Sequence, residues 1–283
     1  MILQQVLNGL SFGALLFLLA SGFTLVFGLM RIANLAHGAF YLLGGYVGVV
    51  VTATTGNLAA GLVAAAIIVA LLATGVERVL LVRVRGNELA EVLLTIGVAF
   101  VVADICLAIF GGNPMSLSVS EWLKGSLTFG PMPYPKYRLF IIGFTVLVGI
   151  ALYLFQQRSR LGAMIRAGVD DREIAAACGI NVDRIMAGVF VLGGVLAGVA
   201  GVIGAGLLSL RPGADVDILL FAMVVVIIGG LGSIKGAAVG SVLIGVIDAT
   251  SRVWFPEFSY FTIFAPMALV LVLRPTGLFG RQT

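Results

Sequence analysis

Long apolar segments alternate with short polar ones along the whole chain. A helix needs about 20 predominantly apolar residues to cross the hydrocarbon core of a bilayer, and most of the apolar segments have about that length. The pattern predicts nine membrane-spanning helices, near residues 6–29, 34–54, 58–76, 90–110, 138–156, 185–208, 216–231, 237–254 and 259–274. The segments 34–54 and 216–231 are also compatible with a broken or re-entrant helix, so about eight to ten spans are expected.

The composition is that of a membrane protein. Hydrophobic residues make up 60% of the 283 residues and charged residues only 11%, with a mean hydropathy of +1.16. Soluble domains carry about 25% charged residues, and a larger core would not remove the need for a charged surface. The 38 glycines suit helices that pack closely within a bilayer. We therefore expect an all-α, polytopic helical bundle that forms a single transmembrane domain over residues 1–283.

The basic residues predict the orientation of this bundle. If the nine spans alternate, twelve of the 17 lysines and arginines fall on one side, together with the loops 77–89 and 157–184 and the C-terminus. Because basic loops stay in the cytoplasm, we expect the N-terminus outside and the C-terminus inside. This asymmetry explains the basic pI of about 9.3 without any nucleic-acid partner. The first apolar run lacks a basic n-region, so it is expected to be retained as the first span.

One polar segment stands out from this pattern. The stretch RSRLGAMIRAGVDDREIAAACGINVDR, from Arg158 to Arg184, holds nine of the thirty charged residues. Within it, Asp170 is predicted to cap a short helix, with Glu173 at the capping-box position and Gly179 as the left-handed stop. From these residues alone, a docking helix and a solvated connector that only sets topology are about equally good interpretations.

Three stretches resemble the shorter type of permease subunit in branched-chain amino-acid ABC importers. The first is LNGLSFGALLFLLASGFTLVFGLMRIANLAHGAFYLLGGY near the N-terminus, with its Asn-Leu-Ala-His-Gly motif at residues 34–38. The second is the late glycine-rich turn IGGLGSIKGAAVGSVLIGVI, which is weak evidence by itself. The third is the polar segment, where the matching residues are Gly162, Arg166, Ala167, Asp170, Ala175, Gly179 and Ile180. Together the stretches extend over nearly the whole chain.

The resemblance implies a function and a set of partners. It implies a non-catalytic permease in the plasma (inner) membrane of a prokaryote, which imports branched-chain amino acids or, as an alternative, urea or short-chain amides. Residues 157–184 would couple it to two ATPase subunits, with Glu173 and Ala176 completing the contact. A second homologous permease or a second copy, and a periplasmic or lipid-anchored solute-binding protein, would complete the complex within the membrane lipid. ATP and magnesium would bind the partner subunits, since this chain has no G-x-x-x-x-G-K-[ST] phosphate loop.

A few polar residues fall within the predicted spans. Asn34, His37 and Gly38 begin the second span, and His37 is the only histidine. His37 and Asn34 either line the transport path at a helix break or hold packed helices together through backbone carbonyls. Asp104 lies inside an apolar run, where an ionisable side chain is expensive and therefore a functional candidate. Thr95 is a weaker candidate. A single histidine is a poor zinc site, so we expect no metal centre.

Two other classes of protein fit this sequence less well. An ion-coupled secondary transporter would need intramembrane carboxylates to carry the coupling ion, and only Asp104 qualifies well. Asp248 has Arg252 four residues later and is expected to pair with it. An intramembrane enzyme would need catalytic groups that one histidine and two isolated cysteines, Cys106 and Cys178, do not supply. Both classes are weaker than an ABC permease.

Overall fold

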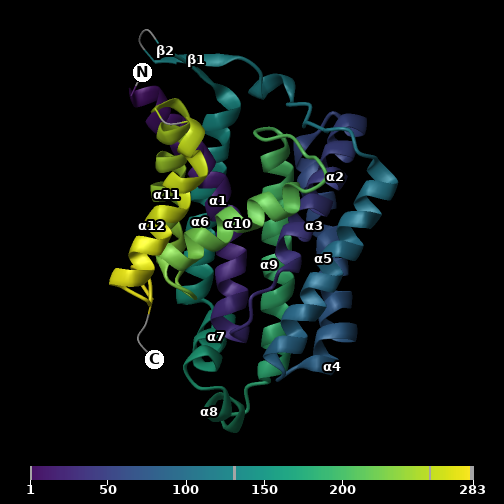
Figure 1. Cartoon of the computed structure of the whole chain (residues 1–283). Helices are drawn as coiled ribbons and strands as arrows, with labels where there is room; N and C mark the ends of the chain where they lie inside the picture. The colour runs from purple at the N-terminus through teal and green to yellow at the C-terminus, as the bar shows by residue number, and fades with distance from the viewer. Residues whose placement is uncertain (1, 130–131, 255, 281–283) are drawn as a thin grey trace.

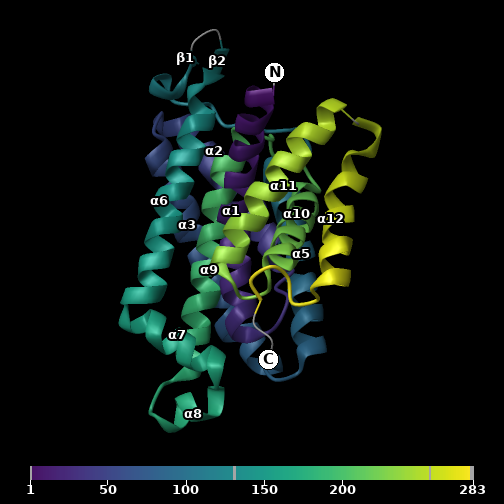
Figure 2. The same cartoon turned by 90° about the vertical axis from the view of Figure 1, so that its left-hand side faces the viewer.

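The computed structural model describes residues 2–129, 132–254 and 256–280, and these form a bundle of helices with a small hairpin at one end (Figures 1 and 2). The helices are α1 (Ile2–Met30), α2 (Ala36–Thr55), α3 (Leu58–Gly75), α4 (Val82–Val84), α5 (Glu88–Phe110), α6 (Lys136–Arg158), α7 (Arg160–Asp170), α8 (Arg172–Ala177), α9 (Val182–Ala205), α10 (Ala214–Gly229), α11 (Ile234–Trp254) and α12 (Ser259–Leu273). Short 3-10 helices cover Glu121–Leu123 and Pro256–Phe258, and a π-helical segment, Val76–Leu81, joins α3 to α4.

All nine predicted spans correspond to helices. Among the described residues, seven helical segments are long and apolar enough to cross a membrane: α1, α2, α3 continued to Val84, α5, α6, α9 and α11. The other two predicted spans are α10 and α12, with 16 and 15 residues. A 16-residue helix is only about 24 Å long, shorter than the hydrocarbon core of about 30 Å. The segment 216–231 is therefore a short helix, preceded by the non-helical residues 206–213.

Helix α1 lies at the centre of the bundle. Its most apolar window is 89% buried, whereas the corresponding windows of α5 and α6 are each only 17% buried. It packs against α6, α9, α10 and α11, and α9 packs in turn against α2 and α3. The crossings of these inner helices use glycines: a Cβ at Gly44 of α2 would lie 2.3 Å from the Cα of Gly198 in α9. Lipid provides no hydrophobic force between helices, so helices in a membrane associate through close packing, and small residues allow it.

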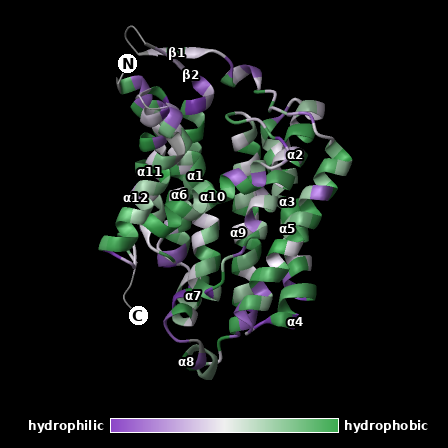
Figure 3. Cartoon of the chain, in the orientation of Figure 1, coloured by the Kyte–Doolittle hydropathy of each residue, from purple (hydrophilic) through white to green (hydrophobic). Residues whose placement is uncertain are grey.

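The two ends of the bundle are polar and structurally different (Figure 3). One end carries the N-terminus and an antiparallel hairpin of β1 (Ser126–Phe129) and β2 (Met132–Pro135), a small β element in a fold predicted to be all-α. The hairpin is fastened to α1 because the Tyr134 hydroxyl donates to the Leu7 carbonyl at 2.7 Å. At the opposite end, α7 lies against the bundle and α8 projects beyond it (Figure 1). We call these the hairpin end and the coupling end.

Candidate functional site

Helix α2 begins inside the bundle and not at its end. After Met30 the chain reverses at Arg31, which has a φ of +57°, and residues 32–35 return between the helices without forming a helix themselves. At the start of α2, the His37 Nε2 lies 3.0 Å from the carbonyl oxygen of Leu19 in α1. Leu19 precedes the end of α1 by eleven residues, or about 16 Å. The second predicted span is therefore a complete helix preceded by a re-entrant segment.

The polar residues predicted near this point satisfy the backbone of the re-entrant segment. Asn34 is buried, and its Oδ1 accepts a hydrogen bond from the Ala36 N–H at 3.1 Å. The Leu35 N–H donates to the Thr95 Oγ1 at 3.3 Å, and this hydroxyl donates onward to the Val92 carbonyl. Backbone groups within a membrane protein need such partners wherever a helix is interrupted. The Asn34 Nδ2 is buried without a partner among the described residues.

His37 is enclosed by protein on all sides. Its side chain has no exposed surface, and its ring packs edge to face on Phe23 with the centroids 5.7 Å apart. Nε2 bonds the Leu19 carbonyl, which is the contact expected of a histidine that holds two helices together. Among the described residues Nδ1 has no partner, and no group of three or more histidine, cysteine or acidic side chains is placed to hold a metal ion.

A second helix that begins within the bundle, α10, meets α2 here. The chain leaves α9 at the hairpin end and returns through residues 206–213, where Leu210 is fully buried and pairs with Met115 through two backbone hydrogen bonds. Helix α10 then starts about midway along the bundle (Figure 3). A Cβ at Gly38 would lie 2.3 Å from the Asp215 carbonyl oxygen, so only glycine allows the two helix starts to touch. We call the meeting point of residues 34–38, Thr95 and Asp215 the mid-bundle junction.

The junction contains four of the five residues predicted to line the path, and one that was missed. Asp215 is buried beside Gly38, but the sequence prediction placed it in an external loop because the apolar run begins at Val216. Gly213, the left-handed residue before α10, was the available signal for a helix beginning there. Asp104 does not belong to the junction. It is nine residues beyond Thr95, which turns a helix by two and a half turns, and it lies on the exposed face of α5.

The predicted coupling segment forms two helices, α7 and α8. Gly162 is buried at the turn between α6 and α7, where a Cβ would lie 2.4 Å from the Gln156 carbonyl oxygen. Arg166 and Ala167 are half-buried on α7, and the Nη1 of Arg166 has no partner among the described residues. Gly168 packs on Leu29, near the end of α1. Helix α7 is therefore seated on the bundle, and Gly162 serves this turn rather than an outer surface.

Helix α8 starts one residue later than predicted. The cap is Asp171, not Asp170, and its Oδ1 accepts hydrogen bonds from the Glu173 and Ile174 N–H groups, both at 2.9 Å. Asp170 ends α7 instead, and Glu173 is one position too early for a capping box. The two acids are adjacent, and the end of α7 decides which is free to cap. The predicted stop at Gly179 is confirmed by its φ of +82° and by the Ile180 N–H bonding to the Ala175 carbonyl.

The outer surface of α8 is small and partly apolar. Ala175 is buried against the rest of the chain, whereas Glu173, Ala176, Ala177 and Cys178 are exposed. Ile174 is 63% exposed, although isoleucine usually avoids water. Ile180 is half-buried where the chain turns into α9. This small, partly apolar surface lies beyond the bundle and is open to contact with another protein.

Two ion pairs that the sequence did not reveal lie at the base of α9, where the polar segment ends. Arg85, after α4, pairs with the buried Glu77 and also donates to Asp183 in the first turn of α9 at 2.9 Å. These contacts connect the turn between α3 and α5 to the base of α9. The pair between Asp248 and Arg252 on α11, which the spacing predicted, is present at 2.8 Å.

This architecture is that of a polytopic helical membrane protein: it has apolar helices of spanning length, two helices that begin midway along the bundle, and a helical segment that projects from one end. Residues 5–273 match the family described as "Branched-chain amino acid transport system / permease component". The chain belongs to this family.

Relatives of known function agree with this assignment. The chain is 32% identical to the high-affinity branched-chain amino acid transport system permease protein LivH of Salmonella typhimurium, over 99% of this chain and 96% of that protein. It is 30% identical to BraD of Pseudomonas aeruginosa, a permease protein with the same description, over the same shares of the two chains. Among solved structures, PsaBC from Streptococcus pneumoniae in complex with Fab has a similar fold, with a TM-score of 0.51 at 14% identity, covering 94% of this chain and 89% of that one.

Proposed function

We propose that this chain forms part of the path by which an ATP-driven importer carries branched-chain amino acids into the cell. The LivH and BraD relatives support this substrate class. The observation on this chain that carries the proposal is α8, a short capped helix with an exposed small face, held beyond the membrane-spanning bundle. The face of Glu173, Ile174, Ala176 and Ala177 would dock in a groove of an ATPase subunit.

The partners follow from this role. Two ATPase subunits would bind ATP and magnesium and would hydrolyse the ATP, so this chain itself would not be an enzyme. A second permease, either a homologue or a second copy of this chain, would complete the path. A periplasmic or lipid-anchored binding protein would deliver the amino acid at the hairpin end. The bundle would sit in the plasma membrane with its N-terminus outside and its coupling end in the cytoplasm.

The contacts of α7 suggest how motion at α8 would reach the path. Helix α7 contacts α8 on one side and the end of α1 on the other, where Gly168 meets Leu29. The chain reverses two residues after Leu29 and returns to the mid-bundle junction. A displacement of α8 toward or away from the ATPase would therefore move the re-entrant segment that positions Asn34 and His37. Interrupted helices of this kind are where transporters rearrange most easily.

The junction would also form part of the path. Asn34, His37, Gly38 and Thr95 are buried in this structure, so they would border the path in a state in which the two helix starts move apart. Asp104 faces outward from α5. A path that includes Asp104 would have to run between this chain and a second permease.

The energy source distinguishes this proposal from a secondary transporter. We expect the full-length chain, purified from its native membranes, to bring an ABC ATPase with it. In sealed vesicles supplied with the binding protein, leucine uptake should require ATP on the side of the membrane where the ATPase subunits lie. It should persist when a protonophore collapses the ion gradient. Uptake that continues without ATP and stops with the protonophore would contradict the proposal.

The native thiols provide a test of orientation. Cys178 is exposed beside α8, while Cys106 is buried in the bundle. An impermeant maleimide should therefore leave the parent unlabelled in intact cells and label it after permeabilisation. With Cys178 replaced by serine, Ser118→Cys in the exposed external loop should react in intact cells. Labelling of Cys178 from outside would reverse the proposed topology.

A further inference from the structure

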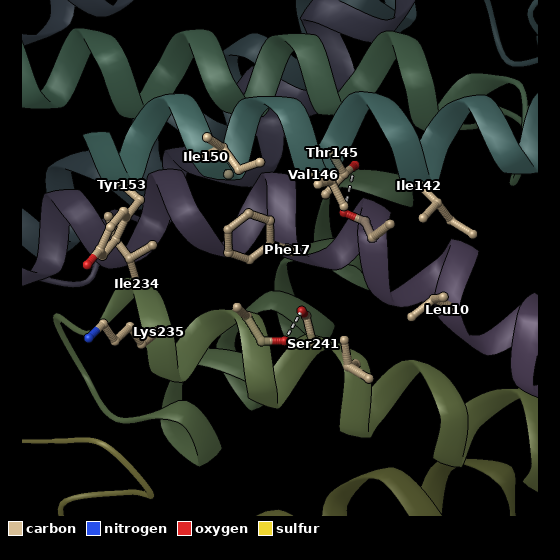
Figure 4. A pocket seen from close by; sticks show the side chains of 14 residues that line it. Leu10, Phe17, Ile142, Thr145, Val146, Ile150, Tyr153, Ile234, Lys235 and Ser241 are labelled. Atoms are coloured by element: carbon tan, nitrogen blue, oxygen red, sulfur yellow. Dashed lines mark hydrogen bonds between the residues drawn. The ribbon is translucent and has the colours of Figure 1, made fainter. Parts of the chain in front are cut away.

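An apolar groove runs along the outside of the bundle between α6 and α11. Both helices pack on α1 and little on each other, so residues of α1 form the floor of the space between them. Figure 4 shows Phe17 of α1 in the middle of this floor, with side chains of α6 and α11 on either side. The groove has a volume of about 350 Å³. Val146 and Ile150 on its rim are each more than half exposed, so it opens toward the surroundings of the bundle.

The buried hydroxyl groups that line the groove are already hydrogen-bonded, so they do not favour a polar ligand. The Thr145 Oγ1 donates to the Ala14 carbonyl at 3.4 Å and the Ser241 Oγ to the Ala238 carbonyl at 2.8 Å. The remaining lining is aliphatic or aromatic, apart from one end. A molecule that fills the groove must therefore be a narrow apolar chain.

A cation marks the end of the groove that faces the coupling end. There Lys235, the second residue of α11, places its Nζ 5.8 Å from the centre of the Tyr153 ring (Figure 4). No ion pair to Lys235 is found within the described parts of the chain. Lysine and tyrosine are typical of the membrane–water interface, where an amphipathic side chain reaches the lipid head groups. This end of the groove therefore offers a positive charge at head-group level.

The length of the groove matches one leaflet of a bilayer. From Tyr153 to Ile142, at the other end of the groove, the α6 backbone advances eleven residues, or about 16 Å. Half of a hydrocarbon core of about 30 Å is about 15 Å. A whole helix, about 10–12 Å across, would cover the rim of such a groove without filling it. The apolar length and the terminal charge together describe a lipid.

We propose that this groove is a binding site for an anionic phospholipid of the leaflet at the coupling end. One acyl chain lies along Phe17 between α6 and α11, and the phosphate group lies against Lys235 beside the Tyr153 ring. Anionic lipids enrich the cytoplasmic leaflet, which supplies this ligand if the coupling end is cytoplasmic. The lipid would brace α6 and α11 against α1, so the site is separate from the mid-bundle junction and from α8.

Native mass spectrometry can test this site on the full-length chain, extracted with its partner subunits from vesicles of equal phosphatidylglycerol and phosphatidylcholine. The parent should retain phosphatidylglycerol in preference to phosphatidylcholine. Lys235→Gln should reduce this preference about fivefold, as expected for one lysine at a membrane surface. Val146→Trp, which fills the groove, should displace the lipid. Leu147→Trp is the matched control, because Leu147 is exposed on α6 but lies outside the groove.

A photoreactive acyl chain on phosphatidylglycerol gives a second measurement that needs no variant. Its cross-links should fall in residues 142–153 and 234–242, and excess phosphatidylglycerol should compete them away. Equal retention of both lipids by the parent, or equal retention by Val146→Trp and Leu147→Trp, would overturn the proposal. So would a photoreactive side chain at position 146 that cross-links to a second permease in place of lipid.

Discussion

Replacing Ala176 with arginine is expected to abolish most ATP-driven uptake while the permease itself remains folded. Ala176 is exposed on α8, so the new side chain does not disturb the packing of this chain. The neighbouring Ala175 is buried and would not allow this separation of effects. On a docked ATPase, a long cationic side chain would be forced into a contact that fits a methyl group. Such overpacking costs about 1–3 kcal/mol, and an unpaired buried charge adds to this.

Three measurements on Ala176→Arg should change together. Leucine uptake and binding-protein-stimulated ATP hydrolysis should both fall by about tenfold or more, since each 1.4 kcal/mol is a factor of ten. The yield of ATPase subunits that copurify with the permease should also fall. Expression and thermal stability of the permease should match the parent. Ser118→Arg, a change of the same kind at an exposed position of the loop after α5, should leave the yield of ATPase subunits, the expression and the thermal stability intact.

The opposite result would change the interpretation of α8. If Ala176→Arg copurifies with the ATPase, hydrolyses ATP and transports leucine like the parent, this face of α8 does not touch the motor. The segment would then be a solvated connector, the other interpretation that its charged residues allow.

Replacing Gly38 with valine is expected to disrupt the bundle itself. Even a single Cβ at this position would lie 2.3 Å from the Asp215 carbonyl and 3.1 Å from the Leu219 Cβ, so α2 and α10 must separate. Overpacking typically costs about 1–3 kcal/mol and occasionally more. Because the obstacle is a backbone carbonyl rather than a flexible side chain, we expect the upper part of this range. The re-entrant segments on both sides would lose their register.

Thermal aggregation in detergent and uptake in vesicles would check the Gly38→Val prediction. Both the midpoint temperature and the uptake should drop clearly relative to the parent. Gly97→Val is a suitable control, because no atom lies within 4 Å of a Cβ at Gly97 on the neighbouring helix α5. A Gly38→Val protein as stable and active as Gly97→Val would show that the two helix starts do not meet as closely as the structure has them.

Several elements of the fold were predictable from local sequence. All nine apolar segments are helices, and the pairing of Asp248 with Arg252 follows from their spacing on one helix face. The stop of α8 at Gly179 is equally local, because a left-handed residue there suits glycine. In each case the deciding interaction involves residues within about one or two helical turns.

The candidate site was less predictable where two residues of one segment were both able to take the same role. Both Asp170 and Asp171 are chemically able to cap α8, and the extent of α7 decides in favour of Asp171. Asp104 is a candidate for the path from sequence because an ionisable side chain in an apolar run is expensive. Thr95 lies on the face of α5 that packs inward, whereas Asp104 lies on its exposed face.

Local sequence is enough to predict that this chain is a helical membrane protein, which segments form its helices, and which polar segment lies outside the apolar bundle. These properties depend on transfer of each apolar segment from water to lipid and on hydrogen bonds within that segment, so no distant residue is needed to predict them. The start of α2 and α10 midway along the bundle, and their contact at Gly38, are visible only in the folded chain. That arrangement depends on contacts between residues about 180 positions apart, such as Gly38 with Asp215, because buried backbone at a helix break must find its partners on other helices.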